Sequence, residues 1–263
     1  MNMKIIFFYM LILLFSSVAF SAETTIRITN GEWEPYMSEY SPHYGLSSHI
    51  VSEAFKLEGI DIKWHFYPWK RSLIVAKKGK DWDASCCWWP SEEIEEQFYI
   101  SEAVNKSSAV FFHMKDNIFD WKSIDDLKNL KIGGTFEYEY SKEFEVAVNE
   151  KRITIDTVPT DEQNFKKLLS GRIDIFPNDP IVGYSQIRNT FPREKIKRFT
   201  HHPKELQSTT LNLIISRQSK KGEYFLKKFN SGLKKLKESG RLDQMLTDVM
   251  NGKYDKQKNK WNE

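Results

Sequence analysis

Segments with the periodicity of strands alternate along this chain with segments that have the periodicity of helices. Apolar residues recur at every second position over 24–30 and 60–66, and at helical spacing over 46–56 and from Trp69 to Ala76. A short buried strand is predicted at 83–87. This β-α-β-α-β order predicts an α/β domain with a mainly parallel sheet.

The second half of the chain repeats this order with different residues. Strands are predicted at 131–133, 153–157, 173–177 and 210–215, and helices over 123–130, 136–149, 225–236 and 242–249. Thr160 and Gln163 belong to a capping box, and Asp179-Pro180 marks another helix start. The chain is therefore predicted to contain two α/β units. The last residues, 253–263, are rich in Lys and Asn, and we expect them to form a disordered tail.

The N-terminal segment has the composition of a secretory signal. Lys4 precedes an apolar run from Ile5 to Phe20, which is shorter than the roughly 18 residues of a membrane span. Ala19 and Ser21 supply small residues for cleavage. We expect a signal peptide over 1–21, cleaved after Ser21 or Ala22, and a soluble exported protein. An uncleaved N-terminal anchor is the alternative.

The charge balance argues against a nucleic-acid partner, and the position of the two cysteines limits what they can cross-link. The 39 Lys and Arg residues nearly balance 36 Asp and Glu residues, so no strong field attracts nucleic acid. Cys86 and Cys87 are adjacent and cannot join distant segments. They are interpreted as small strand residues, as a vicinal disulfide, or as reactive or metal-bound thiols. No metal or other cofactor is expected.

Several short motifs occur in an order that is known from one family. They include the aromatic turn Trp33–Tyr36, Gly45-Leu46 at the first long helix, Asp83-Ala84 at the third strand and a charged turn before Phe98. Gly133-Gly134-Thr135 and Gly171–Asp174 with Asp179 follow in the second half. From about Thr24 to Lys253, the chain resembles the periplasmic solute-binding proteins of ABC importers, family 3, the polar amino-acid type.

The resemblance implies a two-lobed α/β fold of the type II periplasmic binding proteins. Each lobe is expected to contain a mainly parallel sheet flanked by helices, and two hinge strands to join the lobes. Lobe I is expected over 22–112 plus 210–252 and lobe II over 113–209, with crossings near Phe112–Lys115 and Ser208–Leu211. The lobes are expected to close on a ligand by hinge motion.

The resemblance also implies a ligand site between the lobes. The candidate ligand-binding residues are Trp33, Tyr36, Arg71, Cys87, Trp88, Trp89, Thr135 and Asp179. Each has an ordinary alternative. The aromatic side chains could pack within their own lobe, Thr135 and Asp179 could simply cap helices, and Arg71 could be a solvated helix charge.

One position departs from the family pattern. Ile94 stands where amino-acid binders carry an arginine for the ligand's α-carboxylate. An aliphatic side chain cannot form that pair. The cation could instead come from Arg71, or the ligand carboxylate could meet the backbone amides at a helix start near Thr135. Aromatic walls with Asp179 would equally suit a cationic or ring-bearing solute.

The expected function is capture of a small polar solute, an amino acid or a related amine-bearing or ring-bearing compound, for ABC-type uptake. The implied partner is a permease in the inner membrane, and a periplasmic monomer without enzymatic activity is expected. Two alternatives remain. One is a ligand-sensing module that docks to a membrane receptor, and the other is a cyclohexadienyl-type dehydratase on the same fold. No nucleophile elbow, phosphate-binding glycine loop or His-Glu-x-x-His sequence occurs in the chain.

Overall fold

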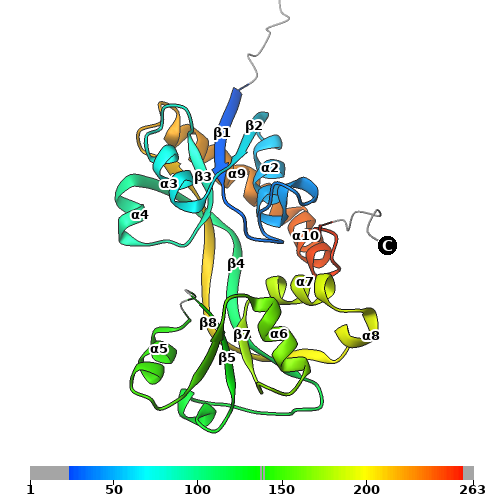
Figure 1. Ribbon diagram of the computed structural model, residues 1–263. Coiled ribbons are helices and arrows are strands. Elements are labelled where there is room, and N and C mark those ends of the chain that lie inside the picture. The colour runs from blue at the N-terminus through cyan, green and yellow to red at the C-terminus, as the bar shows by residue number, and fades with distance from the viewer. Residues whose placement is uncertain (1–23, 137, 139, 257–263) are drawn as a thin grey trace, which may run out of the picture.

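The computed structural model describes residues 24–136, 138 and 140–256, and Figure 1 shows two α/β lobes, one above the other. The predicted signal peptide lies outside the described residues. Within the described part of the chain, no helix combines the length and the apolar character that a membrane span requires.

The first part of the chain contains the following elements: β1 (Thr24–Asn30), the 3-10 helix η1 (Pro42–Tyr44), α2 (Leu46–Lys56), β2 (Ile60–Phe66), α3 (Trp69–Lys77), β3 (Ala84–Trp88), α4 (Glu92–Gln97) and β4 (Phe98–Met114). The remainder contains η2 (Ile124–Leu127), β5 (Ile132–Thr135), α5 (Lys142–Asn149), β6 (Ile155–Val158), α6 (Asp161–Leu169), β7 (Phe176–Asn178), α7 (Pro180–Thr190), α8 (Arg193–Ile196), β8 (Phe199–Ser216), α9 (Gly222–Glu238) and α10 (Arg241–Met250).

The strands form one mixed sheet that runs through both lobes, and one small parallel pair. The large sheet has the order β2-β1-β3-β8-β4-β7. β1 pairs in parallel with β2 and β3, whereas β8 pairs antiparallel with β3 and β4, and β7 pairs antiparallel with β4. The parallel pair β5-β6 belongs to lobe II. The predicted fold class is confirmed, with the addition that the two hinge strands are long and antiparallel.

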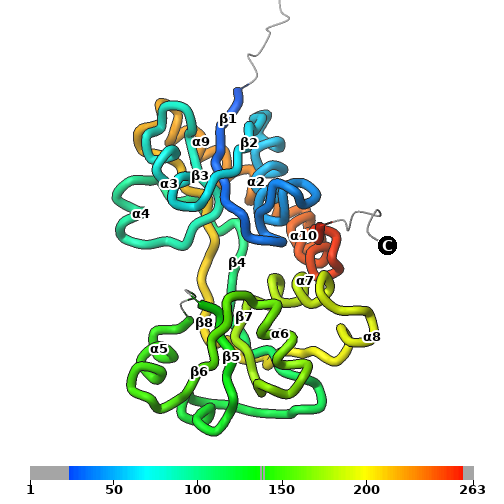
Figure 2. Tube along the Cα trace, in the orientation of Figure 1, coloured from blue at the N-terminus to red at the C-terminus, as the bar shows by residue number. Residues whose placement is uncertain are grey.

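The lobes are connected by the middle of β4 and β8, as Figure 2 shows. Ser208–Leu211 pairs with Asn105–Ser108. Phe112 instead pairs with His201 and is fully buried in the core of lobe II. The predicted crossing near Phe112–Lys115 is therefore wrong, because the apolar end of β4 belongs to that core. We propose that lobe I ends near Asn105 and begins again near Leu211.

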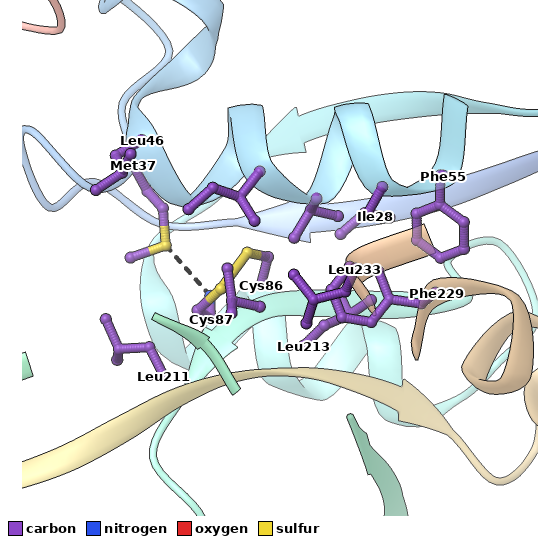
Figure 3. Packing of buried hydrophobic residues seen from close by; sticks show 14 of the residues in the cluster. Ile28, Met37, Leu46, Phe55, Cys86, Cys87, Leu211, Leu213, Phe229 and Leu233 are labelled. Carbon is purple, nitrogen blue, oxygen red and sulfur yellow. Dashed lines mark hydrogen bonds between the residues drawn. A yellow bond between two sulfur atoms is a disulfide. The ribbon is translucent and has the colours of Figure 1, made fainter. Parts of the chain in front are cut away.

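The core of lobe I lies between the sheet and the helices α2, α9 and α10. Figure 3 shows Phe55 of α2 beside Phe229 and Leu233 of α9, with Ile28 and Leu213 from the sheet nearby. The Phe55 and Phe229 ring centroids are 5.3 Å apart. Burial of these apolar side chains is the main stabilising contribution in this lobe.

Lobe II has two smaller cores on the two faces of its strands. Phe112 packs with Phe165 and Phe176 in one, and Phe111 packs with Trp121 and Phe144 in the other. Neighbouring residues Phe111 and Phe112 point to opposite faces because side chains alternate along a strand.

Helix α7 follows the lobe II strand β7 but also packs on lobe I. Its residue Val182 is buried in the lobe I core, whereas Ile187 is buried in lobe II. The Arg188 guanidinium pairs with Asp255 at 2.6 Å, beyond α10 of lobe I. Figure 1 shows α7 and α10 side by side, and residues of the two helices are in contact.

The segment after α10 corrects the predicted tail. Tyr254 is 3% exposed and packs in the lobe I core, and its hydroxyl lies 2.8 Å from His49 Nδ1. The Asp255 carboxylate accepts hydrogen bonds from Ser185 and Arg188. Residues 253–256 are therefore packed rather than disordered, because one aromatic ring and one ion pair anchor them. Residues 257–263 lie outside the described residues.

Candidate functional site

A cavity of about 820 Å³ lies between the lobes, beside the crossing of β4 and β8. Lobe I contributes the turn after β1, α3, the end of β3 and the start of α4. Lobe II contributes the end of β7 and the segment after β5. The middle of the crossing strands completes the wall. The lining residues that the following argument uses are Glu32, Trp33, Trp69, Cys87, Trp88, Trp89, Ser91, Glu93, Ser107, Ser108, Tyr138, Tyr140, Asn178 and Asp179.

Four tryptophans form the lobe I wall of this cavity. Trp33 and Trp89 pack edge to face with ring centroids 6.4 Å apart, and Trp69 and Trp88 do so at 5.2 Å. The Trp88 indole N–H donates to Ser85 Oγ at 2.8 Å. Trp89 is 55% exposed, which is unusual for so large an apolar ring. Prediction from sequence placed Trp33, Trp88 and Trp89 at the site, and all three line the cavity.

Tyr138 and Tyr140 form the opposite wall on lobe II. The Thr135 amide donates to the Tyr140 hydroxyl at 3.0 Å, and the Tyr138 hydroxyl donates to Asp161 at 3.4 Å. Burial raises the pKa of Tyr140 to about 12, and burial and the Asp161 charge also raise the pKa of Tyr138. Both phenols are therefore neutral at physiological pH and can act as hydrogen-bond donors.

Asp179 lines the cavity but is already saturated with hydrogen bonds. Its carboxylate accepts from the hydroxyls of Tyr36 and Ser107 and from the amides of Ser108, Ile181 and Val182. Two of those amides belong to the first turn of α7, so Asp179 is the helix cap. Burial raises the pKa of Asp179, and these hydrogen bonds oppose that shift. The Tyr36 bond joins the two lobes.

Three other predicted residues do not line the cavity. Tyr36 is 1% exposed and packs in the lobe I core, where burial and the Asp179 charge raise its pKa well above the usual value. Arg71 is exposed on α3, and its guanidinium lies 4.5 Å from the centre of the Tyr67 ring. Thr135 is buried and its hydroxyl donates to Asp161.

Thr135 also does not begin a helix. The helix predicted over 136–149 starts at Lys142, because the Ser141 hydroxyl accepts the Phe144 amide and forms the N-cap. The Thr135 backbone amide donates its hydrogen bond to the Tyr140 hydroxyl. The helix-start anion site expected at Thr135 is therefore absent from the described residues.

Ile94 and the cysteines behave as core residues at the margin of the cavity. Ile94 is 7% exposed and packs with Ala76, Phe98 and Ile214. Cys86 and Cys87 are joined by a disulfide and are buried, with the Met37 sulfur accepting the Cys87 amide, as Figure 3 shows. This is one of the states that the sequence left open. Cys87 lines the cavity.

Prediction from sequence missed Trp69, Tyr138, Tyr140 and the acidic lining residues Glu32 and Glu93. Trp69 was interpreted only as part of the helix that contains it. The alternation of aromatic and acidic residues in Phe136–Tyr140, directly after a strand end, is the signal that could have indicated the lobe II wall. Among the described residues, no three His, Cys, Asp or Glu side chains lie close enough to hold a metal ion.

Comparisons with known proteins agree with this architecture. No protein-family model matches the sequence. Over 100 residues the chain is 29% identical to a Bacillus subtilis protein named as the probable amino-acid-binding protein YxeM, a match that spans 38% of each chain.

Two solved structures share the fold over most of the chain. The L-cystine solute receptor of Neisseria gonorrhoeae has a TM-score of 0.68 and 17% identity, covering 90% of this chain and 97% of that one. The second substrate-binding domain of a putative amino acid ABC transporter from Streptococcus pneumoniae has a TM-score of 0.67 and 15% identity, covering 88% and 100%. The chain therefore has the two-lobed fold of the periplasmic binding proteins.

Proposed function

We propose that this chain is an exported solute-binding protein that captures a small polar solute in the cavity between its lobes and delivers it to an ABC-type permease. The solute is an amino acid or a related amine-bearing or ring-bearing compound. One observation carries the proposal. A cavity of about 820 Å³ is lined by aromatic and polar residues of both lobes at the strands that connect them.

A ligand at this place contacts both lobes at once. Trp89 from lobe I and Tyr138 from lobe II line the same cavity. A solute between them favours any arrangement in which both walls touch it, so binding is coupled to closure about β4 and β8. Such coupling distinguishes loaded from empty protein for a partner that recognises the closed form.

The names of similar proteins support uptake rather than catalysis. YxeM is named as a binding protein, and the Streptococcus pneumoniae domain belongs to a putative amino acid ABC transporter. The proposal assigns no reaction to the chain. The partners are one small solute and an inner-membrane permease, and the protein acts as a monomer in the periplasm.

A thermal-shift screen of the purified protein tests solute capture. The panel contains amino acids, polyamines, quaternary amines, small sugars and aromatic acids. A solute that binds only the native state at about 100 times its Kd stabilises it by about 2.7 kcal/mol, so at least one class is expected to raise the Tm in a saturable manner.

Matched tryptophan variants locate the binding. Trp89→Ala should remove most of the Tm shift, whereas Trp82→Ala should retain it, because Trp82 packs against His65 outside the cavity lining. A shift that survives in Trp89→Ala, or a panel without any saturable shift, would contradict solute capture at this cavity.

A further inference from the structure

We propose that the solute is an organic cation without a carboxylate group, whose apolar or ring portion lies on the tryptophan wall. The inference rests on the proposed function, since it names the ligand class of the same cavity. It follows from the charges that line the cavity, from the side-chain caps that already occupy the nearby helix N-termini and from the aromatic rings of the walls.

The described residues that line the cavity carry charge of one sign only. Glu32, Glu93 and Asp179 are acidic, and none of the described lining residues is Lys, Arg or His. A cleft with one sign of charge and apolar walls concentrates ions of the opposite sign. The cavity therefore favours cations and repels a free carboxylate.

Backbone groups near the cavity do not offer an anion site either. At α7 the carboxylate of Asp179 already accepts the first amides of the helix. At α4 the Ser91 hydroxyl accepts the Ile94 amide, and the first turn carries Glu92, Glu93 and Glu95. A ligand carboxylate would have to displace these groups and approach their negative charge.

The single arginine of α3, Arg71, does not supply the missing counter-charge. The Arg71 side chain is directed to the Tyr67 ring at 4.5 Å and does not line the cavity. A zwitterionic amino acid would thus leave its carboxylate without a cationic partner among the described residues that line the cavity, and burial of such a charge is costly.

The walls provide suitable contacts for a cation with an apolar body. Cations bind over the face of indole and phenol rings, and tryptophan is the best of these. Trp33 and Trp89 stand at right angles to each other, with an interplanar angle of 85°, which exposes ring surface in two directions. The Asp179 carboxylate is already occupied by hydrogen bonds within the protein. Glu93, which is exposed on the first turn of α4, is therefore the carboxylate that neutralises the ligand charge.

Calorimetric titration with matched ligand pairs tests the inference directly. The pairs are tryptamine with tryptophan, tyramine with tyrosine, and agmatine with arginine, which differ only in the α-carboxylate. In at least one pair the amine is expected to bind ten-fold or more tightly than the amino acid. An amino acid that binds as tightly as its amine, or a sugar that binds when all amines fail, would overturn the inference and leave solute capture intact. Failure of every solute in the wider panel would overturn both.

Matched variants of α4 test the role of charge. Glu93→Gln should weaken amine binding three- to ten-fold, whereas Glu96→Gln, on the same helix but outside the cavity lining, should leave it unchanged. Trp89→Phe should weaken binding less than Trp89→Ala, because a smaller aromatic face remains. If Glu93→Gln and Trp89→Ala both bound amines as tightly as the wild type does, the inference would be overturned.

Discussion

Asp179 gives the clearest residue-scale prediction, since its carboxylate caps α7 and also accepts two hydroxyls and a strand amide. Asp179→Ala removes the cap and leaves buried donors unsatisfied. We expect the free energy of unfolding to fall by about 3 kcal/mol, measured by urea denaturation. Asp179→Asn keeps an acceptor and should lose less.

Asp116→Ala serves as the control. The Asp116 side chain is largely exposed, so its removal should change the unfolding free energy by less than about 0.5 kcal/mol. An Asp179→Ala protein as stable as the wild type would mean that the five donors find other partners.

His49 makes stability depend on pH in a defined range. Burial and the neighbouring His43 lower its pKa from 6.5 to about 4, although Glu53 opposes that shift. Between pH 6.5 and 4 the unfolded chain takes up a proton at this residue that the folded chain does not. Stability should therefore be complete above pH 6.5 and fall by up to about 3 kcal/mol toward pH 4.

Urea denaturation at pH 7.5, 5.5 and 4.5 measures this effect. His49→Gln should flatten the decline across that range, while substitution of the exposed β2 residue His65, in His65→Gln, should not. Identical pH profiles for the wild type and His49→Gln would exclude His49 as the source.

The residues of the site were only partly predictable. Trp33, Cys87, Trp88, Trp89 and Asp179 line the cavity because they lie at strand ends and turns that the chain order brings to one edge. Arg71 could not be assigned from sequence, because its position on a helix does not fix the direction of a long flexible side chain.

At the element scale, the contact between α2 and α9 depends on one glycine. A Cβ at Gly232 would lie 1.9 Å from the Ala54 carbonyl oxygen of α2. In an exposed helix, Gly→Ala stabilises by about 1 kcal/mol, but here the methyl group must push two helices apart. We expect Gly232→Ala to lower the unfolding free energy by about 1–3 kcal/mol in urea denaturation.

Lys234→Ala is the comparison on the same helix. Its side chain is largely exposed, so a change below about 0.5 kcal/mol is expected. Stabilisation by Gly232→Ala would show that α2 and α9 can separate without loss of packing.

Most elements were predictable where one face is apolar, as in α2, α3, α9 and β2. The length of β8 was not, because its middle is exposed and polar and lacks alternation. Its strand identity comes from pairing with β4, which is distant in sequence. The start of α5 was also missed, since Ser141 decides it by capping rather than by periodicity.

At the scale of the whole molecule, the order of motifs was sufficient to predict the two-lobed fold. The position at which β4 and β8 cross between the lobes and the packing of residues 253–256 after α10 were not predictable. Both depend on which lobe a given aromatic side chain enters, as with Phe112 and Tyr254, and the hydrophobicity of a residue does not specify its lobe.

Helix α7 contributes side chains to the cores of both lobes, and this limits how the molecule can be divided. A fragment cut where β4 and β8 connect the lobes would either lose α7 or keep it with part of its apolar surface exposed to water. Neither half would be a self-sufficient unit that could be shuffled into another protein. Gene fusions and fragment complementation would have to carry this helix together with both of its neighbours.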